Sequence, residues 1–152
     1  MDSSIANRIE DDIKAATKQR APELECLRLI KSTLGNEAIS LRAKNQVLGE
    51  AEVIAVLRRE FKRRHEAATI YKSANRPELA SKELFEAEII KKYLPAEPAA
   101  ADIKQVAERL KNEMGLSGMS AMGPLTKAIM QHFGGAVSGQ TVSSIVKEIL
   151  SV

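Results

Sequence analysis

Apolar residues recur at intervals of three and four along the first 94 residues, and this spacing predicts helices. Four helices are expected, over residues 3–18, 22–43, 50–73 and 77–94. Ser3 or Ser4 is a suitable N-terminal cap, and Pro22 and Pro77 suit the first turns of the second and fourth helices. The expected buried stripe of the third helix consists of Ile54, Leu57, Phe61, Ala68 and Tyr71. The pattern therefore predicts an N-terminal domain of about four long helices.

The pattern changes at a proline-containing joint. Pro95 and Pro98 lack backbone donors and interrupt any helix that reaches Leu94. The apolar residues between Ile89 and Leu94 are expected to dock on the first domain, before the joint begins.

Shorter helices are expected beyond the joint, over residues 102–114 and 123–133 and after a cap at Ser138 or Thr141. Gly115 is the expected stop of the first of these helices and Gly134-Gly135 of the second. The residues of the first tail helix expected to face inward are Ile103, Val106, Leu110 and Met114. Three helices of this length bury only a small core, so we expect the tail to be marginally stable alone.

The predicted fold class is all-α, with a long-helix domain at 1–94 and a three-helix domain at 95–152. Aromatic residues make up 3% of the chain, which favours helices packed through aliphatic side chains over a sheet. No run of about 18 apolar residues is present, so no membrane span is expected. The N-terminus has no secretory pattern, and the single cysteine, Cys26, cannot form an internal disulfide. These features favour a cytoplasmic location.

Charge is distributed unevenly between the two parts. Residues 1–94 hold 18 Lys and Arg against 15 Asp and Glu, whereas residues 95–152 hold five of each class. Any attraction to an anionic partner is therefore expected to come from the first part.

Five basic residues in seven occur between Arg58 and Arg64, in the predicted third helix. On a helical wheel four of them spread over one face away from the core stripe, namely Arg58, Arg59, Lys62 and Arg63. One interpretation is a row of charges for a phosphate backbone. The other is a solvated face with local ion pairs, because Glu60 precedes Arg64 by four residues and Glu66 follows Lys62 by four. No aromatics interleave with the cations for base stacking, and both interpretations stay open.

The residues that usually indicate catalysis or metal binding are sparse. The chain has two histidines and one cysteine, without the spacing of a zinc site, and no phosphate-binding glycine loop or nucleophile elbow occurs. His65 falls on the apolar stripe and is interpreted as a core or boundary residue, with a catalytic base as the alternative. Cys26 is interpreted as a small packed side chain, with a reactive thiol as the alternative. We therefore expect no catalytic residues, no metal and no cofactor.

Several segments resemble the YqeY-like proteins. Residues 27–39 read LRLIKSTLGNEAI, similar to the family's LRxxKSxLxNEAI, and Arg63-Arg64 with Tyr71 also matches. The turn at residues 75–79 and the joint at residues 93–95 resemble the family too. Residues 122–130 and 139–150 resemble its tail pattern, MGxxMxxIM followed by GxxVxxxVKxxL. The resemblance covers essentially the whole chain.

This resemblance implies an all-helical protein in two parts. The tail is similar to the C-terminal domain of the B subunit of glutamyl/aspartyl-tRNA amidotransferase, where it contacts tRNA while the chemistry lies in other domains. The family is often described as having carbon–nitrogen ligase activity with glutamine as amido donor. The sequence departs from the family where residues 99–102 read AAAD in place of a Ser before a run of Glu, and where Gln131, His132 and Gln140 replace basic residues.

Three hypotheses for function follow. The leading one is a non-catalytic module that associates with tRNA or another RNA, with Arg58, Arg59, Lys62, Arg63 and Lys127 as the candidate binding residues. The second is a helical adaptor for a protein partner in translation or amidotransferase complexes, with Met119 and Met122 as candidate contact residues. The third is a carbon–nitrogen ligase, which predicts glutamine hydrolysis or tRNA-dependent amidation by the purified chain.

Overall fold

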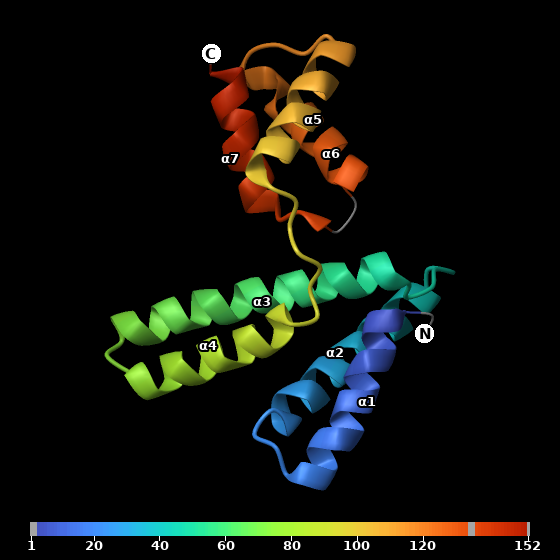
Figure 1. Ribbon diagram of the computed structural model, residues 1–152, viewed down its shortest axis with the longest axis vertical. Coiled ribbons are helices and arrows are strands. Elements are labelled where there is room, and N and C mark those ends of the chain that lie inside the picture. Colours follow the sequence, from blue (N-terminus) through green and yellow to red (C-terminus); the bar gives the residue numbers. More distant parts are fainter. Residues whose placement is uncertain (1–2, 134–135, 152) are drawn as a thin grey trace. The chain divides into compact units, whose positions relative to one another are not determined.

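The computed structural model describes residues 3–133 and 136–151, and within these ranges the chain is helical, with no β-strand (Figure 1). The predicted all-α fold class is confirmed. No helix in the described ranges is long and apolar enough to cross a membrane. The elements are α1 (Ser4–Gln19), α2 (Leu24–Arg42), α3 (Glu50–Ser73), α4 (Pro77–Lys91), α5 (Ala100–Glu113), the 3₁₀ turn η1 (Met119–Ala121), α6 (Met122–Phe133) and α7 (Gly139–Leu150).

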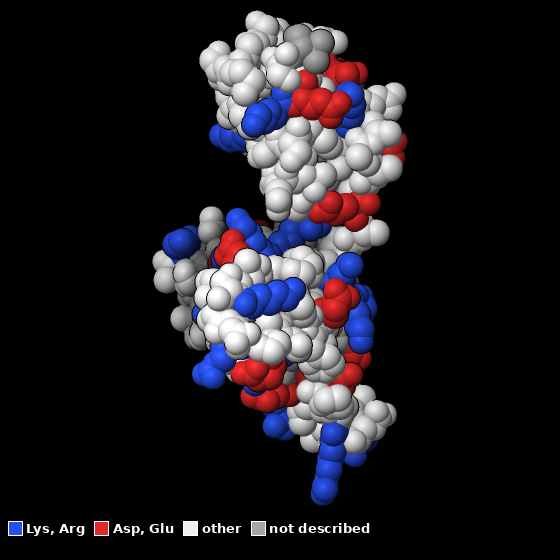
Figure 2. Space-filling model, turned by 90° about the vertical axis from the view of Figure 1, so that its left-hand side faces the viewer, with Lys and Arg blue, Asp and Glu red and all other residues white. Residues whose placement is uncertain are grey.

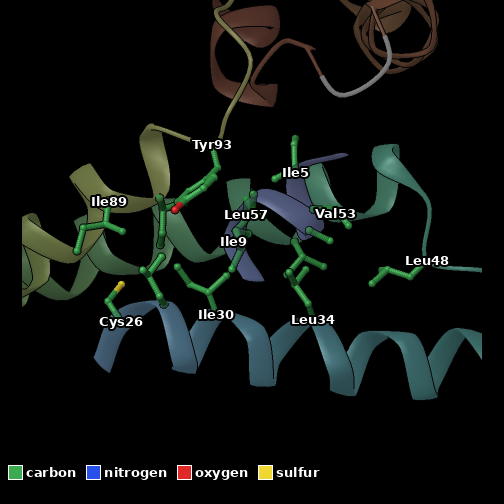
Figure 3. Packing of buried hydrophobic residues seen from close by; sticks show 14 of the residues in the cluster. Ile5, Ile9, Cys26, Ile30, Leu34, Leu48, Val53, Leu57, Ile89 and Tyr93 are labelled. Carbon is green, nitrogen blue, oxygen red and sulfur yellow. The ribbon is translucent and has the colours of Figure 1, made fainter. Parts of the chain in front are cut away.

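The chain divides into two compact units, Met1–Leu94 and Pro95–Val152. In the first unit, α1 and α2 form one helical hairpin and α3 and α4 form a second (Figure 1). The two hairpins share one buried apolar cluster (Figure 3). Its members include Ile9, Ile30, Leu34, Val53, Leu57, Ile90 and Tyr93.

The start of α1 is fixed by side-chain hydrogen bonds from two directions. Ser3 is the N-cap, and its hydroxyl accepts a hydrogen bond from the backbone N–H of Ala6. The hydroxyls of Ser3 and Ser4 both donate to the carboxylate of Glu50, which lies in the first turn of α3. One carboxylate therefore joins the beginnings of two helices, and the predicted cap at Ser3 is confirmed.

Two predicted helix limits in this unit are wrong. Pro22 does not lie in the first turn of α2, because it is part of a turn that precedes Leu24. Helix α4 ends at Lys91, three residues before Leu94. The chain then makes two turn hydrogen bonds, from Tyr93 N to the Ile90 carbonyl and from Leu94 N to the Lys91 carbonyl.

The segment before the joint docks on the first unit, as expected. Ile89, Ile90 and Tyr93 are buried in its core (Figure 3). The Tyr93 hydroxyl donates a hydrogen bond to the Asp12 carboxylate, and the Arg8 guanidinium lies 5.3 Å from the centre of the Tyr93 ring. Burial, followed by the bond to Asp12, raises the pKa of Tyr93 above its ordinary value. These contacts of Tyr93 hold the turn that follows α4 against α1.

The second unit has a core of its own, formed by α5, η1, α6 and α7. Its fully buried side chains include Ile103, Leu125, Ile129, Val137 and Val142. The Ser138 hydroxyl caps α7 by accepting from the Thr141 N–H, which confirms one of the two predicted caps. Glu97 adds a second acceptor there, because its carboxylate takes a hydrogen bond of 2.8 Å from the Ser138 N–H.

The tail also differs from the sequence-based expectation. Helix α5 begins at Ala100 without a side-chain cap, two residues before the predicted start, and Asp102 lies inside its first turn. Met114 is exposed instead of facing inward, because α5 ends at Glu113 and Met114 is its C-cap residue. Gly115 follows with a positive φ of 62°, which suits the expected helix stop. The expected stop at Gly134-Gly135 lies outside the described residues.

Candidate nucleic-acid interface

Helix α3 presents three of the four predicted surface cations with most of the side chain in solvent. The side-chain exposed fractions of Arg59, Lys62 and Arg63 are 59%, 77% and 78%. Arg58 is half-buried, so it offers less of its side chain to a ligand. Lys127 is exposed on α6, in the other unit. On the face shown in Figure 2, Lys and Arg side chains gather on the first unit, whereas the tail surface is mostly uncharged.

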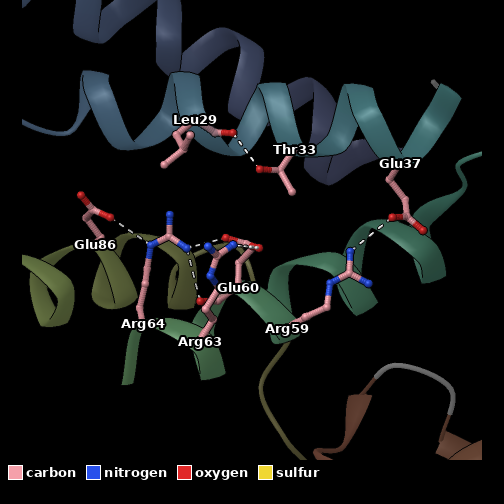
Figure 4. A network of polar contacts seen from close by, with 8 residues as sticks. All are labelled: Leu29, Thr33, Glu37, Arg59, Glu60, Arg63, Arg64 and Glu86. Atoms are coloured by element: carbon pink, nitrogen blue, oxygen red, sulfur yellow. Dashed lines mark hydrogen bonds and ion pairs between the residues drawn. The ribbon is translucent and has the colours of Figure 1, made fainter. Parts of the chain in front are cut away.

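Each of the three exposed cations lies within ion-pair distance of a carboxylate. Arg59 reaches Glu37 of α2 at 3.2 Å, Lys62 lies 3.8 Å from Glu66, and Arg63 lies 3.8 Å from Glu60. The Arg59–Glu37 contact joins α3 to α2 (Figure 4). Exposed pairs such as Arg59–Glu37 and Lys62–Glu66 contribute about 0–1 kcal/mol because water and salt screen them. The cations therefore remain available to a phosphate that competes with the carboxylates.

The fifth cation of the run, Arg64, has a different role. It is only 5% exposed and lies in the interface between α3 and α4. Its guanidinium donates to the Glu60 carboxylate at 2.6 Å and to the Glu86 carboxylate of α4 at 3.0 Å (Figure 4). Burial by itself would lower the pKa of Arg64, but the hydrogen bonds to the two carboxylates outweigh it and the pKa is raised.

Glu60 connects this buried ion network to the surface row. One oxygen of its carboxylate contacts the buried Arg64, and the other lies 3.8 Å from the exposed Arg63. Because Glu60 is 7% exposed and held by Arg64, it provides a fixed carboxylate beside Arg63. The spacing of Glu60 and Arg64 indicated their pairing from sequence, but nothing in the sequence placed Glu86 beside them.

The buried side of α3 is rotated from the predicted stripe. Leu57 and Ala68 are buried as expected, whereas Ile54, Phe61 and Tyr71 are only half-buried. The positions buried in addition are Val53, Val56, Glu60 and Arg64. Because α3 turns the Glu60–Arg64 side toward its neighbours, Phe61 lies at the margin of the core and His65 lies at the surface.

The prediction that His65 lies in the core or at its boundary is wrong, since this side chain is exposed. Its imidazole packs on the Phe61 ring with the two ring centres 4.5 Å apart and the planes tilted by 55°. The exposed His65 thus extends the half-buried Phe61 ring toward solvent, three residues after Lys62.

Cys26 is buried in the first unit, in agreement with a packed side chain. Burial, with the nearby Glu86 as a smaller cause, raises the pKa of its thiol to about 11. A thiol with such a pKa is mostly protonated at neutral pH and is a poor nucleophile. Within the described part of the chain, no group of three or more His, Cys, Asp or Glu side chains is arranged to hold a metal ion.

The two methionines proposed as contacts for a protein partner, Met119 and Met122, differ in exposure. Met119 is exposed, as the adaptor hypothesis requires. Met122 is half-buried and packs against the tail core, so it is not an exposed contact residue. Met114, which was expected inside, joins Met119 at the surface.

Together these observations describe an all-α protein in two units, with an exposed cationic face on its longest helix. Comparison with known protein families identifies the family of this chain. The family described as Yqey-like protein matches residues 6–150, and the chain therefore belongs to the YqeY-like family. A search of curated proteins gave no match.

Proposed function

We propose that this protein is a non-catalytic, RNA-associated module that binds a phosphate backbone through α3. The observation that supports this most directly is the exposure of Arg59, Lys62 and Arg63 on one helix, with more than half of each side chain in solvent. Arg59 and Arg63 are one helical turn apart, about 6 Å along the axis, so both can reach one strand. The sequence resemblance of the tail to a tRNA-contacting domain agrees with this proposal.

The test is a titration of the purified chain with total tRNA at two salt concentrations. We expect salt-sensitive binding by the wild type, because each phosphate neutralised releases counterions. The double variant Arg59→Glu/Arg63→Glu should bind much more weakly and show a shallower dependence of log K on log salt. Loss of about one unit of slope per removed phosphate contact is expected.

A matched charge reversal on α1 provides the control. Lys14→Glu/Lys18→Glu changes the net charge by the same amount at exposed positions on another helix. It should reduce affinity far less than the α3 variant, and circular dichroism should show both variants folded. Equal losses for the two variants, or full tRNA binding by Arg59→Glu/Arg63→Glu, would contradict the assignment to α3.

A second candidate function is a helical adaptor for a protein partner. It is favoured by Met114 and Met119, two exposed, flexible apolar side chains on a tail whose net charge is zero. This alternative predicts that the chain recovers a stoichiometric protein from a lysate treated with nuclease, and that Met114→Ser/Met119→Ser abolishes the recovery. If the recovery survives in the double variant, the tail methionines are not the contact.

A further inference from the structure

The Phe61–His65 pair lies at the margin of the first unit's core, where Phe61 is half-buried and His65 is exposed. Phe61 packs against the buried cluster of the first unit, and the exposed imidazole of His65 contacts its ring at 4.5 Å between ring centres, with the planes tilted by 55°. An exposed imidazole in contact with a second ring offers an aromatic surface on which a base could stack. Such surfaces stack unpaired bases in proteins that bind single-stranded nucleic acids.

Cations flank this pair along the same side of α3. Seven residues separate Arg58 from His65, and seven more separate His65 from Lys72. Each step of seven residues changes the direction around the helix by only about 20° and advances about 10 Å along its axis. Lys62 lies one turn before His65, and 77% of its side chain is exposed. The only carboxylate paired with Lys62 in the described structure is that of Glu66, at 3.8 Å.

The structure thus separates the cations of α3 into two groups. Arg59 contacts Glu37, and Arg63 contacts Glu60. Around the helix, Lys62 lies between these two arginines and His65. A strand whose phosphates contact Lys62 would have a neighbouring base within reach of the imidazole, because three residues of helix span about 4.5 Å.

We propose that Phe61 and His65 form a stacking site for one unpaired base of an RNA whose adjacent phosphate is held by Lys62. The inference rests on the proposed RNA-binding function and specifies its ligand as RNA with an unpaired segment, such as a loop or an end. Stacking accepts any base, because every base has an aromatic face. The site therefore distinguishes unpaired from paired RNA without selecting a sequence.

The experiment compares the full chain and its variants in titrations with a single-stranded oligouridylate and with an RNA duplex of equal length. His65→Ala should weaken binding of the single strand about tenfold, equivalent to about 1.4 kcal/mol. It should change the affinity for the duplex by no more than about twofold. For both RNAs the slope of log K against log salt concentration should stay the same, because stacking releases no counterions. His65→Phe, which keeps a ring, should restore single-strand affinity.

Two further variants separate stacking from charge and from general loss of structure. Lys62→Gln should weaken both ligands and lower the salt slope by about one. Phe85→Ala removes an exposed aromatic side chain from another helix, α4, and should change neither ligand's affinity.

The outcomes are distinguishable. If the wild type binds neither RNA at low salt, the proposed function fails and the stacking site fails with it. If the wild type binds RNA through Arg59 and Arg63 but His65→Ala leaves single-strand affinity within twofold, the stacking site alone is overturned. Equal weakening of single-strand and duplex binding by His65→Ala would also overturn it, as would failure of His65→Phe to restore affinity.

Discussion

Arg64 is a buried cation whose charge is balanced by two carboxylates, one from its own helix and one from α4. Within this network, Arg64 is the shared donor and Glu60 and Glu86 are the acceptors. Taking one partner of a buried ion network away is costly because the remaining charges lose both solvent and counter-charge. The network therefore fixes the side of α3 that faces α4, because Arg64 must lie where it reaches both carboxylates.

We predict that Arg64→Leu lowers the free energy of unfolding of the first unit by about 3–5 kcal/mol. The physical reason is that Glu60 and Glu86 would be left as neighbouring carboxylates in a desolvated interface. Urea unfolding followed by circular dichroism measures the change. Arg63→Leu, one position away but exposed, should stay within about 0.5 kcal/mol of wild type.

A triple change provides the complementary test. Replacing Arg64, Glu60 and Glu86 together by apolar residues of similar size should recover most of the stability lost in Arg64→Leu, because the unpaired charges are then absent. A loss of stability below about 1 kcal/mol for Arg64→Leu alone would show that water solvates Glu60 and Glu86 in the variant. The buried network would then contribute little to the packing of α3 on α4.

At the scale of the element, the beginnings of α1 and α3 are held by Glu50. The Ser3 hydroxyl has two partners, since it accepts from Ala6 and donates to Glu50. Glu50 also accepts from the Ser4 hydroxyl at 2.9 Å. The bond from Ser3 is the largest cause of a lowered pKa at Glu50, followed by an opposing effect of burial and then by the bond from Ser4.

This contact predicts a specific pH dependence. Since the pKa of Glu50 is lower in the folded protein than its ordinary value of 4.5, its contribution to stability is fully present above that pH and is lost as the pH falls through the folded value. Glu50→Gln should therefore reduce stability at neutral pH and lessen the fall in stability on acidification. Ser3→Ala should cost about 1 kcal/mol through loss of the cap.

Thermal unfolding at a series of pH values between neutral and 3 measures both effects. Glu25→Gln is the control, because 86% of the Glu25 side chain is exposed and its contact with Lys82 is 4.0 Å long. If Glu50→Gln follows the same pH dependence as wild type, Glu50 does not stabilise the start of α1.

At the scale of the whole molecule, the two units have separate apolar cores. Each cluster contains side chains from one unit only. The tail core is small, and a unit of this size depends on a few fully buried residues such as Leu125 and Ile129. The stability of the tail should therefore respond to changes that leave the first unit unaffected.

We predict that Leu125→Ala destabilises the tail by about 2–5 kcal/mol, which is comparable with the whole stability expected of so small a unit. Two-dimensional NMR during heating should show loss of the signals of residues 95–152 while those of residues 3–94 keep the wild-type midpoint. Leu57→Ala should have the reverse effect. A common shift of both midpoints in either variant would show that the units unfold as one.

The sequence by itself determined the helical class and most helix limits, because periodicity, prolines and caps act locally. The limits of α3 were predicted at Glu50 and Ser73, where the structure has them. Ser3, Pro77 and Ser138 were recognised as start signals for the same reason. Cys26 was recognised as a packed residue because it lies beside the apolar stripe of α2.

Only the tertiary structure decided which side of α3 is buried. A helical wheel gives the angles between residues but not the direction of the neighbouring helix, and a mixed stripe permits more than one rotation. Glu86, 22 residues further along the chain, binds Arg64 and so turns the Glu60–Arg64 side inward. That rotation exposes His65 on Phe61, and with it the surface from which the stacking site is inferred.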